Sequence, residues 1–155
     1  CDHNEQGALG LMINRPTDLA LTELLKKFDC ATNVDADLVV VEGGPVQQER
    51  GFVLHSTDVQ TSGSMPIGND LLLTASRDIL EIIGAGAGPK HFIVTLGYAG
   101  WGEGQLESEL ADNAWLTVPA TNEILFDTPF DKRVDAAAKS LGINFQLMSP
   151  HLGHA

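Results

Sequence analysis

The segment His91–Leu96 (HFIVTL) is the most apolar stretch of the chain, and it constrains the fold more than any other feature. A run of β-branched and aromatic residues of this length is typical of a strand at the centre of a sheet. Further short apolar runs stand at residues 7–13, 38–41, 51–55, 71–74 and 115–118, and Phe145, Leu147 and Met148 indicate a last strand. The sequence therefore predicts a fold built around a β-sheet.

Four other stretches are predicted to form helices, because apolar residues recur at helical spacing or local capping signals are present. They are residues 19–28, 76–83, 105–112 and 130–141. Asp18 and Ser76 are the expected N-caps of the first two, and Gly142 is expected to end the last.

The order of these elements predicts an α+β fold. Strands come mostly in runs and helices are spaced unevenly, which favours a mixed, mostly antiparallel β-sheet with helices packed against it. Residues 46–50 are short enough for a hairpin, so strands 38–41 and 51–55 are expected to pair antiparallel. With 155 residues, the chain is expected to be a single compact domain over residues 1–155, with residues 149–155 as a flexible tail.

Charge and cysteine content narrow the classes of function. A formal net charge of −12 argues against direct binding to nucleic acid or to an anionic membrane surface, since both depend on Lys and Arg. Cys1 and Cys30 are the two cysteines, too few for a disulfide framework in a chain that can build its own core. We therefore expect a cytoplasmic, reducing environment and no membrane association.

The glycine-rich residues 97–104 are expected to form a loop between a strand and a helix, where phosphate-binding loops occur. Their spacing, G-x-x-G-x-G-x-G, matches neither common nucleotide-binding motif. Glu103 and Glu107 would also lie where the anion binds. We predict a tight turn rather than a phosphate site.

Two pairs of side chains could carry chemistry. Cys1 and His3 would share one face of a strand, where an imidazolium could activate the thiol. His55 and Ser56 could offer a base beside a nucleophile, although neighbouring residues of a strand point to opposite faces. Structural roles are favoured for both pairs, and we predict no catalytic residue, no metal site and no cofactor.

Tyr98 and Trp101 are the strongest candidates for a binding surface, because large aromatic side chains in a loop need a surface to pack against. For Trp101, packing against the edge of its own core is an equally good interpretation. Segments whose residues are least explained by packing complete the candidate surface. The candidate surface consists of Gly43, Gly44, Pro45, His55, Ser56, Gly97, Tyr98, Gly100, Trp101 and Gly102.

Five motifs occur in a fixed order: CDHN at residues 1–4, GLMINRP at 10–16, GGPV at 43–46, FVLHS at 52–56 and LGYAGWG-x-GQLE-x-EL at 96–110. Together they closely resemble the bacterial YqgE/AlgH family. The resemblance implies a compact single-domain α+β protein of the bacterial cytoplasm. Family members usually carry about thirty further residues before the Cys1 segment, which this chain is expected to lack. The family is often labelled as transcriptional regulators, but the resemblance implies no particular activity.

These observations predict a non-enzymatic cytosolic binding or regulatory module that acts indirectly, through a protein or small-molecule partner. The expected helix at 19–28 is followed by a strand, so no helix-turn-helix is present to read DNA. Two alternatives stay open. One is a small enzyme or redox protein that uses Cys1 and His3 or His55 and Ser56. The other is a direct DNA-binding regulator, which the net charge disfavours.

Overall fold

Strand β8 (Phe92–Trp101) runs through the centre of the computed structural model, which describes residues 1–144. One edge of β8 pairs antiparallel with β5 (Val46–Ser56). Its other edge pairs with β4 (Val39–Glu42) in parallel and then with β2 (Gly7–Gly10) antiparallel. The central strand predicted at 91–96 is confirmed, although it continues for five more residues.

The remaining strands extend the sheet outward from this centre. β1 (Asp2–Asn4) pairs with β2, and β3 (Pro16–Ala20) pairs with β4. On the opposite side, β7 (Leu71–Thr74) pairs with β5 and β6 (Ser64–Ile67) pairs with β7. All these pairs are antiparallel, so β4 and β8 form the one parallel pair within residues 1–144. The predicted mixed, mostly antiparallel α+β fold is confirmed.

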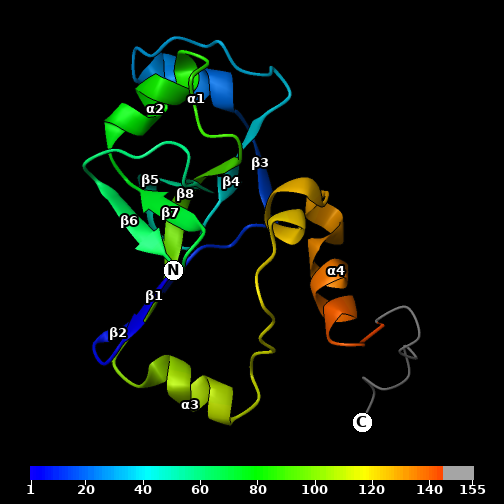
Figure 1. Ribbon diagram of the computed structural model, residues 1–155. Helices are drawn as coiled ribbons and strands as arrows, with labels where there is room; N and C mark the ends of the chain where they lie inside the picture. The colour runs from blue at the N-terminus through cyan, green and yellow to red at the C-terminus, as the bar shows by residue number, and fades with distance from the viewer. Residues whose placement is uncertain (145–155) are drawn as a thin grey trace.

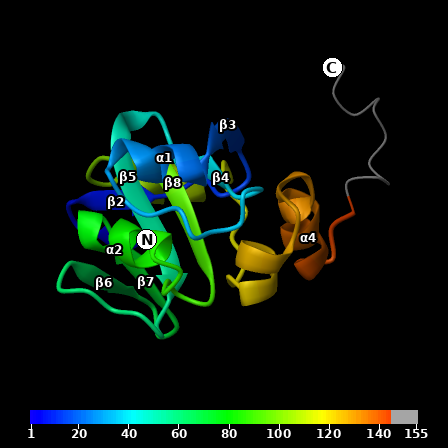
Figure 2. The same ribbon diagram turned by 90° about the horizontal axis from the view of Figure 1, so that it is seen from above.

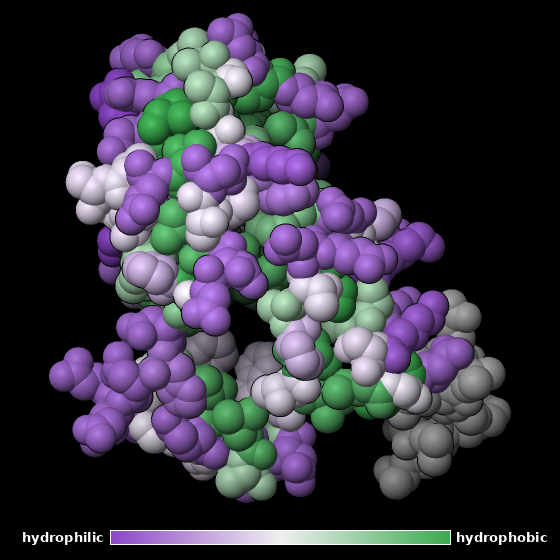
Figure 3. Space-filling model, viewed as in Figure 1, coloured by the Kyte–Doolittle hydropathy of each residue, from purple (hydrophilic) through white to green (hydrophobic). Residues whose placement is uncertain are grey.

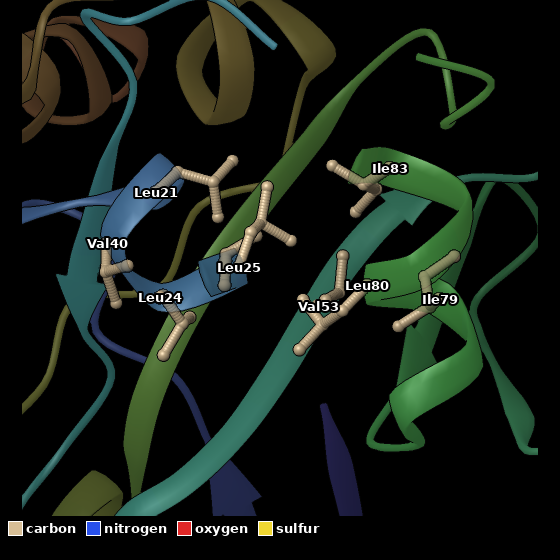
Figure 4. Packing of buried hydrophobic residues seen from close by; sticks show 9 residues of the cluster. Leu21, Leu24, Leu25, Val40, Val53, Ile79, Leu80 and Ile83 are labelled. Atoms are coloured by element: carbon tan, nitrogen blue, oxygen red, sulfur yellow. The ribbon is translucent and has the colours of Figure 1, made fainter. Parts of the chain in front are cut away.

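Helices α1 (Leu21–Lys27) and α2 (Arg77–Gly84) lie beside each other over one face of the sheet (Figures 1 and 2). Their apolar side chains meet above β5, where Val53 points toward them (Figure 4). The buried cluster consists of Leu21, Leu24, Leu25, Val40, Val53, Ile79, Leu80, Ile83 and Val94. Burying each of these side chains contributes about 1.5–3 kcal/mol, so this layer is a main source of stability.

The part of the chain that follows β8 departs from this body. Helix α3 (Gln105–Ala111) lies next to β1 and β2 at the lower end in Figure 1. The π-helical turn η1 (Glu123–Asp127), the 3₁₀ turn η2 (Phe130–Lys132) and α4 (Arg133–Ser140) lie to the side of the sheet (Figures 1 and 2). Arg133 attaches this part to the body, since Nη1 of its guanidinium donates a hydrogen bond to the Ile13 carbonyl.

Some sequence predictions fall outside the part that the structure describes. The last strand at Phe145, Leu147 and Met148 and the flexible tail at 149–155 both lie beyond residue 144. Over the described 144 residues, every helix is too short or too polar to cross a bilayer.

Three local features differ from the sequence prediction, for physical reasons. The predicted helix at 19–28 forms as α1, but it begins only at Leu21 and Asp18 does not cap it, because residues 16–20 form strand β3, which pairs with β4. Residues 64–67, which no predicted element includes, form β6, where Pro66 is tolerated on an edge strand. Residues 115–118, expected as a strand, run from α3 toward η1 without regular secondary structure (Figure 1) and have no strand partner within residues 1–144.

The predicted pairing of strands 38–41 and 51–55 is also wrong, because β8 lies between β4 and β5. The connection from β4 to β5 crosses β8 at Gly43, Gly44 and Gly97. The Gly43 N–H donates a hydrogen bond to the Leu96 carbonyl at 2.8 Å. A Cβ atom on Gly43 would overlap the Gly97 carbonyl, and one on Gly44 would overlap that of Tyr98. Only glycine lets the two backbones approach this closely.

The glycine loop predicted at 97–104 is wrong for residues 97–101, because these residues continue strand β8. Gly97, with φ +77°, and Gly100 lie inside β8, and pairing continues through Trp101 opposite Ala8. A turn begins only at Gly102. Gly97 is needed because its backbone contacts the Gly44 carbonyl at the crossing, not because a loop begins there.

We expect Gly44→Ala to lower the free energy of unfolding by about 3 kcal/mol, the upper end for overpacking, because the new Cβ would overlap the Tyr98 backbone. Gly51→Ala is the matched control in β5, since its Cβ would lie 3.8 Å from the nearest atom outside its chain neighbours. Denaturant unfolding of both variants measures the difference. Equal stability of the two would contradict the close crossing.

Candidate functional site

The candidate surface divides into two groups at opposite ends of β8. His55 pairs with Phe92, the first residue of the strand, and Trp101 is its last. Ten residues of strand span about 30 Å, so these ends cannot contact one ligand of ordinary size. The structure therefore does not bring His55 and Ser56 together with Tyr98, Gly100, Trp101 and Gly102.

Gly43, Gly44 and Gly97, expected on the surface, are buried at the crossing, and Pro45 beside them is exposed. The expectation that packing explains these glycines least is wrong, because packing of backbone on backbone requires all three. They position β8 for the residues that follow.

His55, also expected on the surface, is fully buried. Its Nδ1–H donates to the carbonyl oxygen of Ser56 at 2.8 Å. Nε2 shares a hydrogen bond with the Thr74 hydroxyl, also at 2.8 Å. Both ring nitrogens are thus satisfied inside the core, where His55 links β5 to β7.

The Ser56 hydroxyl points away from the His55 ring, as strand alternation predicts. It donates to the Asp58 carboxylate at 2.5 Å and accepts a hydrogen bond from the His91 N–H at 3.1 Å. Asp58 also accepts the Lys90 N–H at 2.9 Å. These contacts fasten the end of β5 to the start of β8. His55 and Ser56 therefore do not form a base and nucleophile pair.

The pKa of Asp58 is lowered, chiefly by the hydrogen bond from the Ser56 hydroxyl and then by the Lys90 N–H. Both donors favour the charged carboxylate. The cluster is thus held together best when Asp58 is ionised.

His3 turns toward α3 rather than forming a pair with the Cys1 thiol. Its Nε2 lies 2.6 Å from Glu107 Oε1, between two half-exposed side chains. The pKa of Glu107 is lowered by a backbone hydrogen bond and by the hydrogen bond with His3. This contact joins β1 to α3. Cys1 is an exposed free thiol.

Metal ligands do not gather anywhere in residues 1–144. No group of three or more His, Cys, Asp or Glu side chains there is arranged to hold a metal ion.

Tyr98 and Trp101 have different surroundings. Tyr98 is half-buried and meets Phe52 edge to face, with ring centroids 5.8 Å apart, on the face of the sheet opposite α1 and α2. Trp101 is half-buried against Gly10, where a Cβ would lie 3.1 Å from the indole ring. Trp101 also meets Trp115 edge to face, with centroids 5.8 Å apart. Trp101 thus contacts both the sheet and an exposed aromatic side chain.

Trp115 and Leu116 are the residues that sequence reasoning missed. They are among the exposed large apolar side chains, with exposed fractions of 48% and 66%. The signal was present, since residues 115–118 (WLTV) have the composition of a strand. We refer to Trp101 and residues 115–120 as the tryptophan face. Figure 3 shows hydrophobic surface in this lower part of the molecule, around α3 and the segment that follows it.

The backbone of residues 115–120 also makes no hydrogen bond to the part of the chain that the structure describes. Hydrogen bonds within α3 and its C-terminal turn end with the Ala114 N–H, which donates to Glu109, and resume with the Ile124 N–H, which donates to the Thr121 hydroxyl. Among residues 1–144, none bonds the peptide groups of residues 115–120. An extended segment with free donors and acceptors is a template for another strand.

Comparison with known proteins gives one consistent result. The AlgH-like family matches residues 1–146. A UPF0301 protein of Thioalkalivibrio sulfidiphilus is 53% identical over 156 residues, covering 100% of this chain and 84% of that protein. One from Dechloromonas aromatica is 51% identical over 157 residues, with 100% and 84% covered. The solution structure of the AlgH protein from Pseudomonas aeruginosa has a TM-score of 0.79 and 47% identity, covering 99% of this chain and 82% of that one.

Asp58→Asn should reduce the amount of stability that the protein loses as the pH falls from 7 to 3. The folded pKa of Asp58 lies below the unfolded value of about 3.9, so its stabilisation is present above that pH and is lost as pH falls through the folded pKa. The group is exposed, so the loss is about 1 kcal/mol or less. Chemical unfolding at pH 7 and pH 3 tests this. A variant that is weaker than the native chain by the same amount at both pH values would contradict it.

Proposed function

This chain belongs to the AlgH-like family, and from that premise we propose that it is a non-enzymatic binding module. Its working surface is the tryptophan face. The partner is a protein that lays an extended segment along residues 115–120. The observation that carries the proposal is the combination of an unpaired backbone with exposed apolar side chains.

Addition of a partner strand would use both the unpaired backbone and the exposed apolar side chains. The free C=O groups of residues 115–120 and the N–H groups of all of them except Pro119, which has none, would supply affinity through main-chain hydrogen bonds, and alternate side chains would supply specificity. Trp115 and Leu116 are adjacent, so in an extended segment they face opposite ways. A partner strand could therefore meet an apolar side chain on each face.

The Trp101 ring gives this surface a rigid support. Trp115 rests edge to face on Trp101, which is itself fixed by its place in β8 and its contact with Gly10. Tryptophan is enriched among the residues that dominate interface energies. Holding one ring in place before binding lowers the entropy that binding must overcome.

A regulatory role through such a partner is indirect, and the charge of the chain supports this reading. A net charge of −12 opposes the phosphate contacts on which DNA affinity depends. Both cysteines, Cys1 and Cys30, are free thiols, in keeping with a module that works in the reducing cytoplasm. The activity needs no cofactor.

The test is capture of partners from a bacterial lysate by the tagged chain and by four variants. Trp115→Ala/Leu116→Ala removes the exposed apolar groups, and Thr117→Pro removes a backbone donor from the proposed strand pairing. Met65→Ala, a half-exposed apolar residue on β6, and Thr117→Ser are the matched controls. We expect the partner to be lost in the first two variants and retained in the controls.

Each variant should keep its melting temperature within about 4 °C, because exposed substitutions cost little. A partner that stays bound to folded Trp115→Ala/Leu116→Ala and to folded Thr117→Pro would refute the proposed surface.

A further inference from the structure

A cavity lies far from the tryptophan face in the fold, between the sheet and the C-terminal helical turns. Its volume is about 300 Å³, and its walls come from β4, the start of β8, η1, η2 and α4. Three phenylalanines, Phe92, Phe126 and Phe130, line it together with aliphatic residues such as Leu21 and Val39. A dry cavity of about 150 Å³ can hold a benzene ring, so this one has room for a ring with a short substituent.

Arg133 also lines this cavity, and only 6% of it is exposed. Its guanidinium is fixed on three sides. Nε donates to the Thr128 carbonyl at 3.0 Å, and Nη1 donates to the carbonyl of Ile13. The central carbon lies 4.3 Å from the centroid of the Phe130 ring.

The charge of Arg133 has no counterion among the residues that the structure describes. No carboxylate of residues 1–144 lies within 4.0 Å of the guanidinium, since the ion pairs of that region are His3 with Glu107 and Arg77 with Glu81. Burial lowers the pKa of Arg133, because the charged form loses solvent. Burying an arginine beside a hydrophobic wall without an acidic partner is costly, and an anion in the cavity would offset that cost.

One part of the guanidinium is free to bind such an anion. Nη2 makes no hydrogen bond to the described residues, and it is not among their buried polar atoms that lack a partner. Its N–H groups can therefore still reach a bound ligand or solvent. A carboxylate oxygen is the acceptor that guanidinium donors match best.

We propose that this cavity binds a small organic acid, a monocarboxylate with an aromatic or branched apolar body. The apolar body packs among the phenylalanines and the carboxylate accepts a hydrogen bond from Arg133 Nη2. Asp37 and Asp127 also line the cavity and are exposed. Their negative charges disfavour a second acidic group, so the ligand carries one carboxylate rather than two.

This site is independent of the tryptophan face, and its test needs no captured partner. Phenylacetate and phenylacetamide have nearly the same size and shape, but only the first carries a charge. In titrations followed by amide NMR, we expect phenylacetate to bind at least about tenfold more tightly, because its hydrogen bond to Arg133 is charge-assisted. The signals that shift should belong to residues 38–41, 92–94 and 126–133.

Two variants sharpen the result. Arg133→Met should reduce phenylacetate affinity to that of the amide, whereas Lys139→Met, which removes an exposed cation of the same helix, should leave it unchanged. Asp37→Asn should tighten binding about twofold or more by removing a repulsive charge.

Equal affinity for acid and amide, binding of neither, or shifts confined to other residues would each overturn the proposal. Because the acid and amide are compared on the native chain, the proposal stays testable even if Arg133→Met does not fold.

Discussion

The close contact of backbone on backbone at Gly43, Gly44 and Gly97 is the constraint on which the rest of the structure depends. It lets the chain leave β4, cross β8 and enter β5 on the opposite edge within four residues. β8 consequently has strands on both edges and becomes the axis of the molecule. The helical layer packs over the first half of that axis, since Val94 belongs to the cluster beneath α1 and α2.

The second half of β8 has a different role, because it carries the chain away from the helical layer. Pairing with β2 continues to Trp101, and the contact of His3 with Glu107 then fixes α3 against the same hairpin. Residues 115–120 emerge from α3 unpaired, with Trp115 resting on Trp101. The glycines at 97 and 100, predicted to form a loop, thus lie within the strand that supports the tryptophan face.

Features that depend on local sequence could be predicted. The helix at 77–84 follows from its apolar spacing and the helix at 105–111 from its position after the glycines, and the strand at 92–96 follows from its β-branched residues. Features that depend on distant contacts could not. Nothing near β4 indicates that its neighbour is β8, more than fifty residues later, rather than β5. A glycine needed for a close crossing also looks the same in sequence as a glycine in a turn. Residues 115–118 have strand composition but no partner strand within residues 1–144, and that mismatch is the observation on which the proposed partner-binding segment rests.

The intrinsic tryptophan fluorescence tests the central claim most directly, because Trp101 and Trp115 are the two tryptophans of the chain and both belong to the tryptophan face. Emission and acrylamide quenching would be recorded on the isolated protein over a range of dilutions. An open face requires solvent-like emission and ready quenching from Trp115 at every dilution, with Trp101, which is half-buried, contributing the less accessible fraction. Blue-shifted emission that resists acrylamide even at the lowest concentration would mean that the chain covers these rings itself, and would contradict a free binding surface.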